Sequence, residues 1–224
     1  MPRRVESGGE RRAGAATAQP IGRRERNKQE KRARIVDAAR RLFREKGFAE
    51  TTTLEIAGAA DIGTGTLFLY ARSKEDLLVM VFRDEMMETA MAAFAALRPG
   101  EPLLDQLVQV FAAMMSHHER DPELAKILLK EIMFPSNGER VADISELMDA
   151  IFAGLADMLA AARDAGALRP DFDARLVAES LFSSYFMDMM EWLRGNWTRA
   201  RFLDRLRQHL AITIDGLAAA RELR

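Results

Sequence analysis

Residues 51–77, TTTLEIAGAADIGTGTLFLYARSKEDL, constrain the fold of this chain more than any other stretch. Thr52 with Glu55 three residues later fits a capping box, which predicts the start of a short helix. That helix should end near Asp61, because aspartate tolerates the left-handed backbone conformation of a helix terminus. A second short helix follows and runs to about Tyr70. Two short helices joined by a tight turn are the layout of a helix-turn-helix, so the segment predicts a reader of DNA.

The same stretch resembles the TetR family of bacterial one-component transcriptional regulators. The family pattern reads I-A-x-x-A-G-V-S-x-G-T-L-Y-x-[HY]-F-x-S-K-E-x-L. It is met by Ile56, Ala57, Ala60, Gly65, Thr66, Leu67, Tyr70, Ser73, Lys74, Glu75 and Leu77. Upstream, Gly47-Phe48 matches the exit of the family's first helix, so the resemblance covers roughly residues 26–80. Beyond that range it is only architectural.

Four positions depart from the family pattern. Asp61 stands where the family has a turn glycine, and Gly63 stands where a serine would cap the recognition helix. Phe68 replaces a tyrosine whose hydroxyl, by the resemblance, would contact a phosphate. Ala71 replaces a phenylalanine that packs the small domain, and Phe68 is a candidate to fill the space.

The charge of the chain is divided between its two parts. Residues 1–76 carry a net charge of +6 and residues 77–224 carry −7, although the whole chain is close to neutral. A basic front on an acidic body indicates a polyanionic partner for the front alone. The chain has no cysteine and no apolar run of membrane-spanning length, so we expect a cytoplasmic protein without disulfides or a membrane partner.

Residues 1–25 are rich in Arg, Gly and Ala and are expected to form a disordered basic arm. The arm either searches DNA or enters a minor groove, or it is a solvated tail. Apolar residues at helical spacing then predict one helix over residues 27–46. By the resemblance, its N-terminal residues Arg26 and Lys28 lie close to phosphate.

The remainder of the chain contains only helical patterns. Further helices are expected at about 74–97, 102–118, 122–134, 138–165, 173–195 and 198–222. The prediction is therefore an all-α protein of nine helices. We divide it into the arm at 1–25, a helix-turn-helix DNA-binding domain at 26–76 and a ligand-binding and dimerisation domain at 77–224.

Methionines are concentrated in the larger half of the chain, where all twelve after Met1 lie between Met80 and Met190. Their general role is to fill gaps in a core. The resemblance adds a second interpretation, because this family places an effector pocket among the helices between about residues 77 and 190. The residues expected to border such an apolar cavity of several hundred Å³ are Met114, Met115, Met133, Phe134, Met158 and Met187.

Two acidic residues, Glu131 and Asp188, interrupt apolar stretches. Helical geometry can turn them to solvent. If either points inward, its carboxylate would favour a cationic or hydrogen-bonding ligand.

The last two helices have apolar stripes wider than one core needs, which predicts a four-helix interface about a two-fold axis. The expected interface residues are Leu181, Phe182, Tyr185, Leu203, Leu206, Leu210 and Leu217. A dimer is also what a helix-turn-helix protein needs to read two half-sites.

The favoured interpretation is a homodimeric transcriptional regulator of TetR type, a repressor that a small apolar effector releases from a double-stranded DNA operator. We expect Thr64 and Leu69 to contact base edges, with Gly65 allowing close approach. The residues expected to contact backbone phosphates are Arg26, Lys28, Thr52, Thr53, Thr66, Tyr70 and Lys74.

No pattern supports a catalytic site, a cofactor or a metal site, since the three histidines are scattered and the glycines at 63 and 65 follow no strand. Two alternatives remain. One is a DNA-binding protein without an effector or under the control of another protein. The other is a helical ligand-binding or enzymatic protein whose basic front is incidental.

Overall fold

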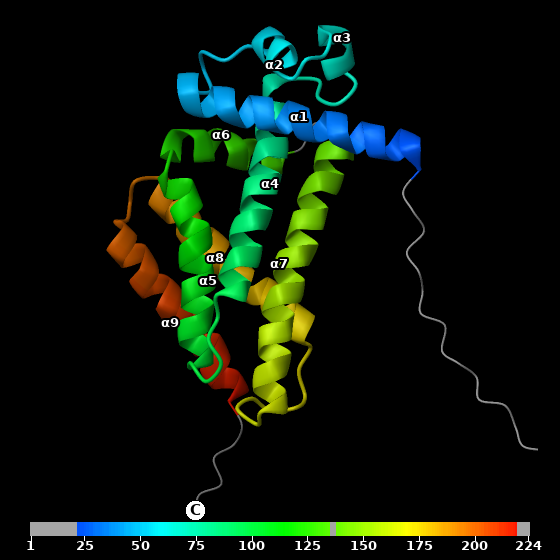
Figure 1. The fold of residues 1–224 in the computed structure, drawn as a ribbon. Helices are drawn as coiled ribbons and strands as arrows, with labels where there is room; N and C mark the ends of the chain where they lie inside the picture. The colour runs from blue at the N-terminus through cyan, green and yellow to red at the C-terminus, as the bar shows by residue number, and fades with distance from the viewer. Residues whose placement is uncertain (1–21, 135–137, 219–224) are drawn as a thin grey trace, which may run out of the picture.

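The computed structural model describes residues 22–134 and 138–218, and over these residues the protein is helical throughout, with no strand (Figure 1). Its nine helices in this part of the chain confirm the predicted fold class. They are α1 (Arg23–Lys46), α2 (Thr53–Ala59), α3 (Thr64–Leu67), α4 (Lys74–Ala95), α5 (Leu103–Glu119), α6 (Pro122–Met133), α7 (Gly138–Asp164), α8 (Ala174–Leu193) and α9 (Arg199–Leu217).

Helices α1 to α3 form a small unit at one end of the molecule, with α1 lying across the top of the larger bundle (Figure 1). Ile35, Ile56 and Leu67 are fully buried at the centre of this unit. Leu77 is also fully buried, although it belongs to the first turn of α4. One helix therefore joins the small unit to the bundle, and the predicted domain division after residue 76 falls within its first turn.

The larger bundle is built around α4, which packs on α1 at one end and on α5 and α7 along its length (Figure 1). Helix α6 lies crosswise just beneath α1, and α8 and α9 complete the bundle. Phe111, Leu155 and Leu206 are fully buried in its core. Among the described residues, no helix combines the length and the apolar character needed to cross a lipid bilayer.

Three predicted helix boundaries differ from the observed ones by three residues or more. Helix α1 begins at Arg23, within the segment assigned to the arm. No glycine or proline interrupts residues 23–26, so the helix extends back to its N-cap at Gly22. Helix α3 ends at Leu67, and the chain continues to Tyr70 as tighter turns in which the N–H of Leu69 donates to the carbonyl of Thr66. The predicted helix at 198–222 ends at Leu217. The rest of the predicted arm, residues 1–21, lies outside the described residues.

Candidate DNA-binding surface and effector cavity

The turn between α2 and α3 is built as the sequence predicts. The N–H of Glu55 donates to Thr52 Oγ1 over 3.2 Å, and the N–H of Thr52 donates to Glu55 Oε2 over 2.9 Å, which completes the capping box. Asp61 has a φ of 54° and so adopts the left-handed conformation that ends α2. Gly63 precedes α3 without a side-chain cap. The turn fixes α3 against α2 and leaves its outer side open.

Exposed apolar side chains lie on α2 and in the turns that follow α3. Leu69 is 78% exposed, Leu54 is 69% exposed and Phe68 is 47% exposed. Exposed apolar groups beside a recognition helix suit contacts with thymine methyl groups in a major groove. Phe68 does not fill the space left by Ala71, which is itself buried.

The other residues expected to contact DNA lie at different depths in the same unit. Thr64 and Thr66 are half-buried on α3, whereas Gly65 between them is exposed and has no protein atom near the position of a Cβ. Thr53 is half-buried at the start of α2, and the hydroxyl of Thr52 is already engaged in the capping box.

A basic hollow lies between the first turns of α1 and Tyr70, which follows α3 in the chain. Arg24, Lys28 and Lys31 line it together with Tyr70 and Glu25. Two residues expected to contact phosphate, Lys28 and Tyr70, are therefore brought together although they are far apart in the sequence. Arg26 is exposed on the same part of α1 and forms a weak ion pair with Glu30 at 3.9 Å.

Lys74 does not point to the open surface. Its ammonium donates to the carbonyl oxygens of Phe48 (2.6 Å) and Ala49 (2.9 Å), and it lies 4.5 Å from the centre of the Phe48 ring. This lysine holds the connection between α1 and α2 against the start of α4. We predicted Lys74 as a phosphate ligand, and these contacts within the protein were not predicted.

An apolar cavity of about 70 Å³ lies in the core of the larger bundle. Its walls come from α4 to α8, and among the residues lining it are Phe82, Met86, Met114, His118, Leu129, Ile132, Ile144, Leu147, Met148, Ile151, Phe182, Tyr185, Phe186 and Met189. Of the six residues expected to border a cavity, only Met114 lines it. The cavity is also much smaller than the several hundred Å³ predicted.

The other five residues lie elsewhere for reasons of helix orientation. Met133 and Phe134 end α6 on its outer side, where they are 50% and 76% exposed, and Met187 is 57% exposed on α8. Met115 is buried and Met158 is half-buried, but neither lines the cavity. The cavity does lie among the helices between about residues 77 and 190, as predicted. The methionines that line it with Met114 are Met86, Met148 and Met189.

Two polar groups on the cavity wall are buried without a hydrogen-bond partner among the described residues. They are Nδ1 of His118 and the hydroxyl of Tyr185. Burial lowers the pKa of His118 to about 3, so this side chain stays neutral, and burial raises the pKa of Tyr185. An unpartnered buried polar atom costs free energy that a ligand can recover by supplying the missing hydrogen bond. The cavity thus favours an apolar ligand that carries a polar group.

The two interrupting carboxylates have partners in the protein. Glu131 is ion-paired with Arg140, and Asp188 lies 3.0 Å from Nδ1 of His209 on α9. Burial is the main cause that raises the pKa of Asp188. Neither carboxylate is aimed at the cavity, so they do not favour a cationic ligand.

Arg140 joins the DNA-binding end of α4 to the bundle. It is buried near the start of α7 and forms ion pairs with Asp76 on α4 and with Glu131 on α6. Its third contact is with Ser73 Oγ at 3.2 Å, and that hydroxyl also accepts from the N–H of Asp76 to cap α4. The sequence analysis did not predict a role for Arg140, because no local motif relates this arginine to its distant partner Asp76.

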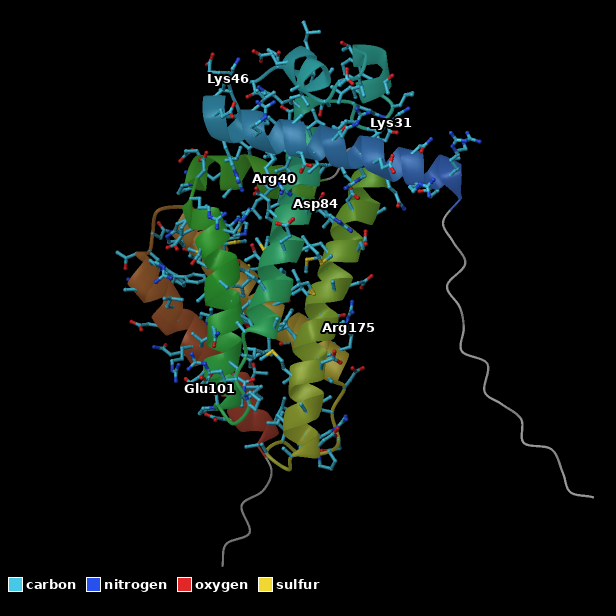
Figure 2. All side chains as sticks on the ribbon, in the orientation of Figure 1. Lys31, Arg40, Lys46, Asp84, Glu101 and Arg175 are labelled. Atoms are coloured by element: carbon cyan, nitrogen blue, oxygen red, sulfur yellow. The ribbon has the colours of Figure 1, made fainter. Side chains whose placement is uncertain are left out.

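More ion pairs cross from α1 to the bundle. Arg32 on α1 lies 3.3 Å from Asp84 on α4 and 3.4 Å from Asp143 on α7. Arg40 lies 3.5 Å from Glu85, and Figure 2 shows Arg40 on the side of α1 that faces α4. Part of the positive charge of the N-terminal half is therefore used within the protein rather than offered to DNA.

The apolar residues expected at a dimer interface are mostly core residues of one protomer. Leu181, Tyr185, Leu206, Leu210 and Leu217 are buried, and Phe182 and Leu203 are half-buried against them. Within the protomer, α7 packs on α8 and α5 packs on α9. Burial within the protomer leaves only Phe182 and Leu203 of this set partly accessible, and the interface itself stays a prediction.

The outer faces of the same two helices carry a different set of residues. Leu176, Ser180, Ser183 and Met187 repeat along one exposed side of α8. On α9, Ile212 is 72% exposed. Apolar side chains alternating with small ones form a surface that another helix can approach closely.

Comparison with known proteins agrees with this architecture. Residues 35–81 match the sequence model of the bacterial regulatory proteins of the tetR family, and residues 104–191 match that of the tetracyclin repressor-like C-terminal domain. The chain is 24% identical over 169 residues to the fatty acid metabolism regulator protein of Bacillus subtilis, covering 75% of this chain and 87% of that protein. It is 26% identical over 166 residues to the transcriptional repressor KstR of Rhodococcus jostii, covering 73% of each.

Among solved structures, the chain is similar to FadR of Thermus thermophilus, a transcriptional repressor determined in complex with lauroyl-CoA. The two share 26% identity with a TM-score of 0.67, over 86% of this chain and 98% of that one. The similarity spans both the DNA-binding unit and the helical bundle.

Proposed function

The chain belongs to the TetR family of bacterial regulatory proteins and is a DNA-binding transcriptional regulator under the control of a small ligand, and on this premise we propose that its effector is a fatty acyl thioester of coenzyme A. The observation that carries the proposal is the likeness to a repressor bound to lauroyl-CoA, together with an apolar cavity in the same bundle. Regulators of this family are generally not enzymes, and we propose no catalytic activity for this one.

The chemistry of the cavity suits an acyl thioester. Its wall is aliphatic, aromatic and methionine-rich, and its two unpartnered polar groups, on His118 and Tyr185, suit a carbonyl oxygen. A volume of about 70 Å³ is well below the roughly 300–1,000 Å³ of a ligand site. Acyl binding then requires the walls to separate, and flexible methionine side chains allow this at low cost. The ligand would stabilise a wider bundle, which is a shift of population away from the DNA-binding form.

For DNA, we propose that the open side of α3 enters the major groove. Thr64, Gly65 and Leu69 face the bases there. Lys28 and Tyr70 hold a phosphate at the basic hollow, which lies beside α3. The bound form is a homodimer that pairs through the outer faces of α8 and α9, because those faces expose Leu176, Met187 and Ile212. We propose a cytoplasmic location, because the operator DNA lies in that compartment.

The effector proposal is tested by calorimetric titration of the purified protein with lauroyl-CoA. We expect saturable binding by the wild type and no binding of free coenzyme A in the same range. Met148→Trp fills the cavity and should abolish binding. Met91→Trp, on the exposed side of α4, is the matched control and should bind as the wild type does. Equal binding by both variants would place the acyl chain elsewhere.

A second candidate is a regulator that responds to no small effector. The small volume of the cavity favours it, because the side chains around it are already nearly in contact. Absence of binding for acyl thioesters of several chain lengths would support this candidate.

A further inference from the structure

A second and larger cavity, of about 370 Å³, lies at the junction between the small unit and the bundle. Its walls come from α1, from α4, from the end of α5 and from α6. One part of the wall is apolar. The rest carries the cations Arg40, Arg44 and Arg120, together with Glu85 and Asp121.

Glu85 is the shared partner of two of these cations, Arg40 and Arg44. Its carboxylate lies 2.5 Å from Arg44, 3.5 Å from Arg40 and 3.8 Å from Nε2 of His117. Arg40 also lies 3.7 Å from Glu88, whose side chain is largely exposed and does not line the cavity. On the wall itself, three arginines stand against two carboxylates, which leaves one positive charge in excess. Burial is the main cause that lowers the pKa of His117.

Several polar atoms of the junction cavity still lack a hydrogen bond. Within the described part of the chain, Nε of Arg40 and the Nδ1 atoms of His117 and His118 are buried and have no hydrogen-bond partner. The distance from Arg40 to Glu85 is that of an ion pair without hydrogen-bond geometry at Nε. Buried donors without acceptors, next to excess positive charge, are what an anionic ligand satisfies.

The junction cavity and the apolar cavity share two wall residues, Phe82 and His118. Their rings lie 5.7 Å apart. These two side chains therefore form part of the partition between the charged space and the apolar space. The unpartnered Nδ1 of His118 belongs to the partition itself.

We propose that the two cavities are the two halves of one site for an amphiphile with an anionic head. The apolar chain occupies the core cavity, and the anionic group lies in the junction cavity, where it competes with Glu85 for Arg40 and Arg44. The proposal rests on the acyl thioester effector, and it assigns the phosphate groups of coenzyme A to the junction cavity.

The position of these arginines gives the effector a direct route to the DNA-binding unit. Arg40 and Arg44 belong to α1, whereas Glu85 belongs to α4. An anion that takes the arginines breaks the ion pairs that hold α1 on α4 at this point. The orientation of α1 then changes, and with it that of α2, which packs on α1 and on α3.

The test compares three variants by calorimetric titration with lauroyl-CoA. Arg44→Gln should weaken binding by roughly ten- to a hundred-fold, the value of a hydrogen bond to a charged group. Arg41→Gln is the matched control, because Arg41 lies on the same helix, pairs with Glu45 and does not line the cavity. Its affinity should equal that of the wild type. Glu85→Gln removes the competitor and should tighten binding.

The result with Glu85→Gln separates ligand binding from a merely structural role, since loss of a structural ion pair would not strengthen binding. Unchanged affinity in Arg44→Gln and Glu85→Gln, with normal binding by the wild type, would overturn the junction site and leave the acyl thioester effector intact. Dodecyl phosphate, which has the chain and an anionic head without coenzyme A, is the second probe. If it binds in an Arg44-dependent manner while lauroyl-CoA does not, the junction site stands and the thioester proposal fails. If neither binds, both fail.

Discussion

Arg140→Met is the substitution that most severely tests how the DNA-binding end is attached to the bundle. The side chain of Arg140 is 6% exposed, and it neutralises Asp76, which is equally buried, and Glu131, which is largely buried. Methionine keeps much of the apolar volume but removes the charge, so two carboxylates lose their cation inside the protein. Removing one member of a buried ion pair costs about 3–5 kcal/mol. For a chain of this size, that lowers the melting temperature by roughly 6–20 °C.

The assay is thermal and urea unfolding followed by circular dichroism at one fixed protein concentration, because a dimer has a concentration-dependent melting temperature. The matched control is Arg169→Met. Arg169 lies 3.5 Å from Asp171, and both side chains are largely exposed, so its loss should cost no more than about 1 kcal/mol. Adding Asp76→Asn and Glu131→Gln to Arg140→Met should recover part of the stability. If Arg140→Met and Arg169→Met prove equally stable, the network contributes nothing and the reasoning is refuted.

Three further outcomes are expected. Leu210→Ala should cost about 2–5 kcal/mol of folding free energy yet leave the dimer intact, whereas Ile212→Glu should give a folded monomer by light scattering; the reverse pattern would restore the interface first predicted. Burial lowers the pKa of His118 to about 3 from 6.5, so below pH 6.5 the unfolded state binds a proton that the folded state does not bind. The free energy of unfolding should therefore fall by about 2 kcal/mol between pH 6.5 and pH 5. The variant His118→Phe should lack this contribution, and the same pH dependence in both proteins would show that His118 is not buried in its neutral form. Phe68→Tyr should tighten DNA binding by about 0.5–1.5 kcal/mol, since the ring is half-exposed beside α3; unchanged affinity would mean that no phosphate lies within reach.

The parts of the fold that depend on local chemistry could be predicted from the sequence. The capping box at Thr52 and the left-handed turn at Asp61 each involve residues within a few positions of one another. The caps at Asp121 and Ser73 are equally local, since each side chain accepts a hydrogen bond from an N–H three residues later. These contacts join residues only a few positions apart, so a short stretch of sequence contains the pattern that predicts them.

The parts that depend on which helix covers which face could not be predicted in the same way. The stripe that contains Leu206 and Leu210 shows that one side of α9 is buried, but the same stripe serves a protomer core or an interface between copies. The ion pairs of Arg140 join residues 64 positions apart or cross from α6 to α7, and no pattern in the sequence relates them. The exposure of Met133 and Phe134 follows from the way α6 crosses beneath α1, which periodicity does not specify.

The most direct test of the account measures DNA binding and effector binding in the same preparation. A DNA site is first selected from a random duplex library, and fluorescence anisotropy of the labelled duplex then gives its affinity for the protein as lauroyl-CoA is added. We predict that lauroyl-CoA releases the DNA, that coenzyme A alone does not, and that saturating DNA weakens lauroyl-CoA binding by the same factor. Lauroyl-CoA that binds the protein but leaves its affinity for DNA unchanged would contradict the account.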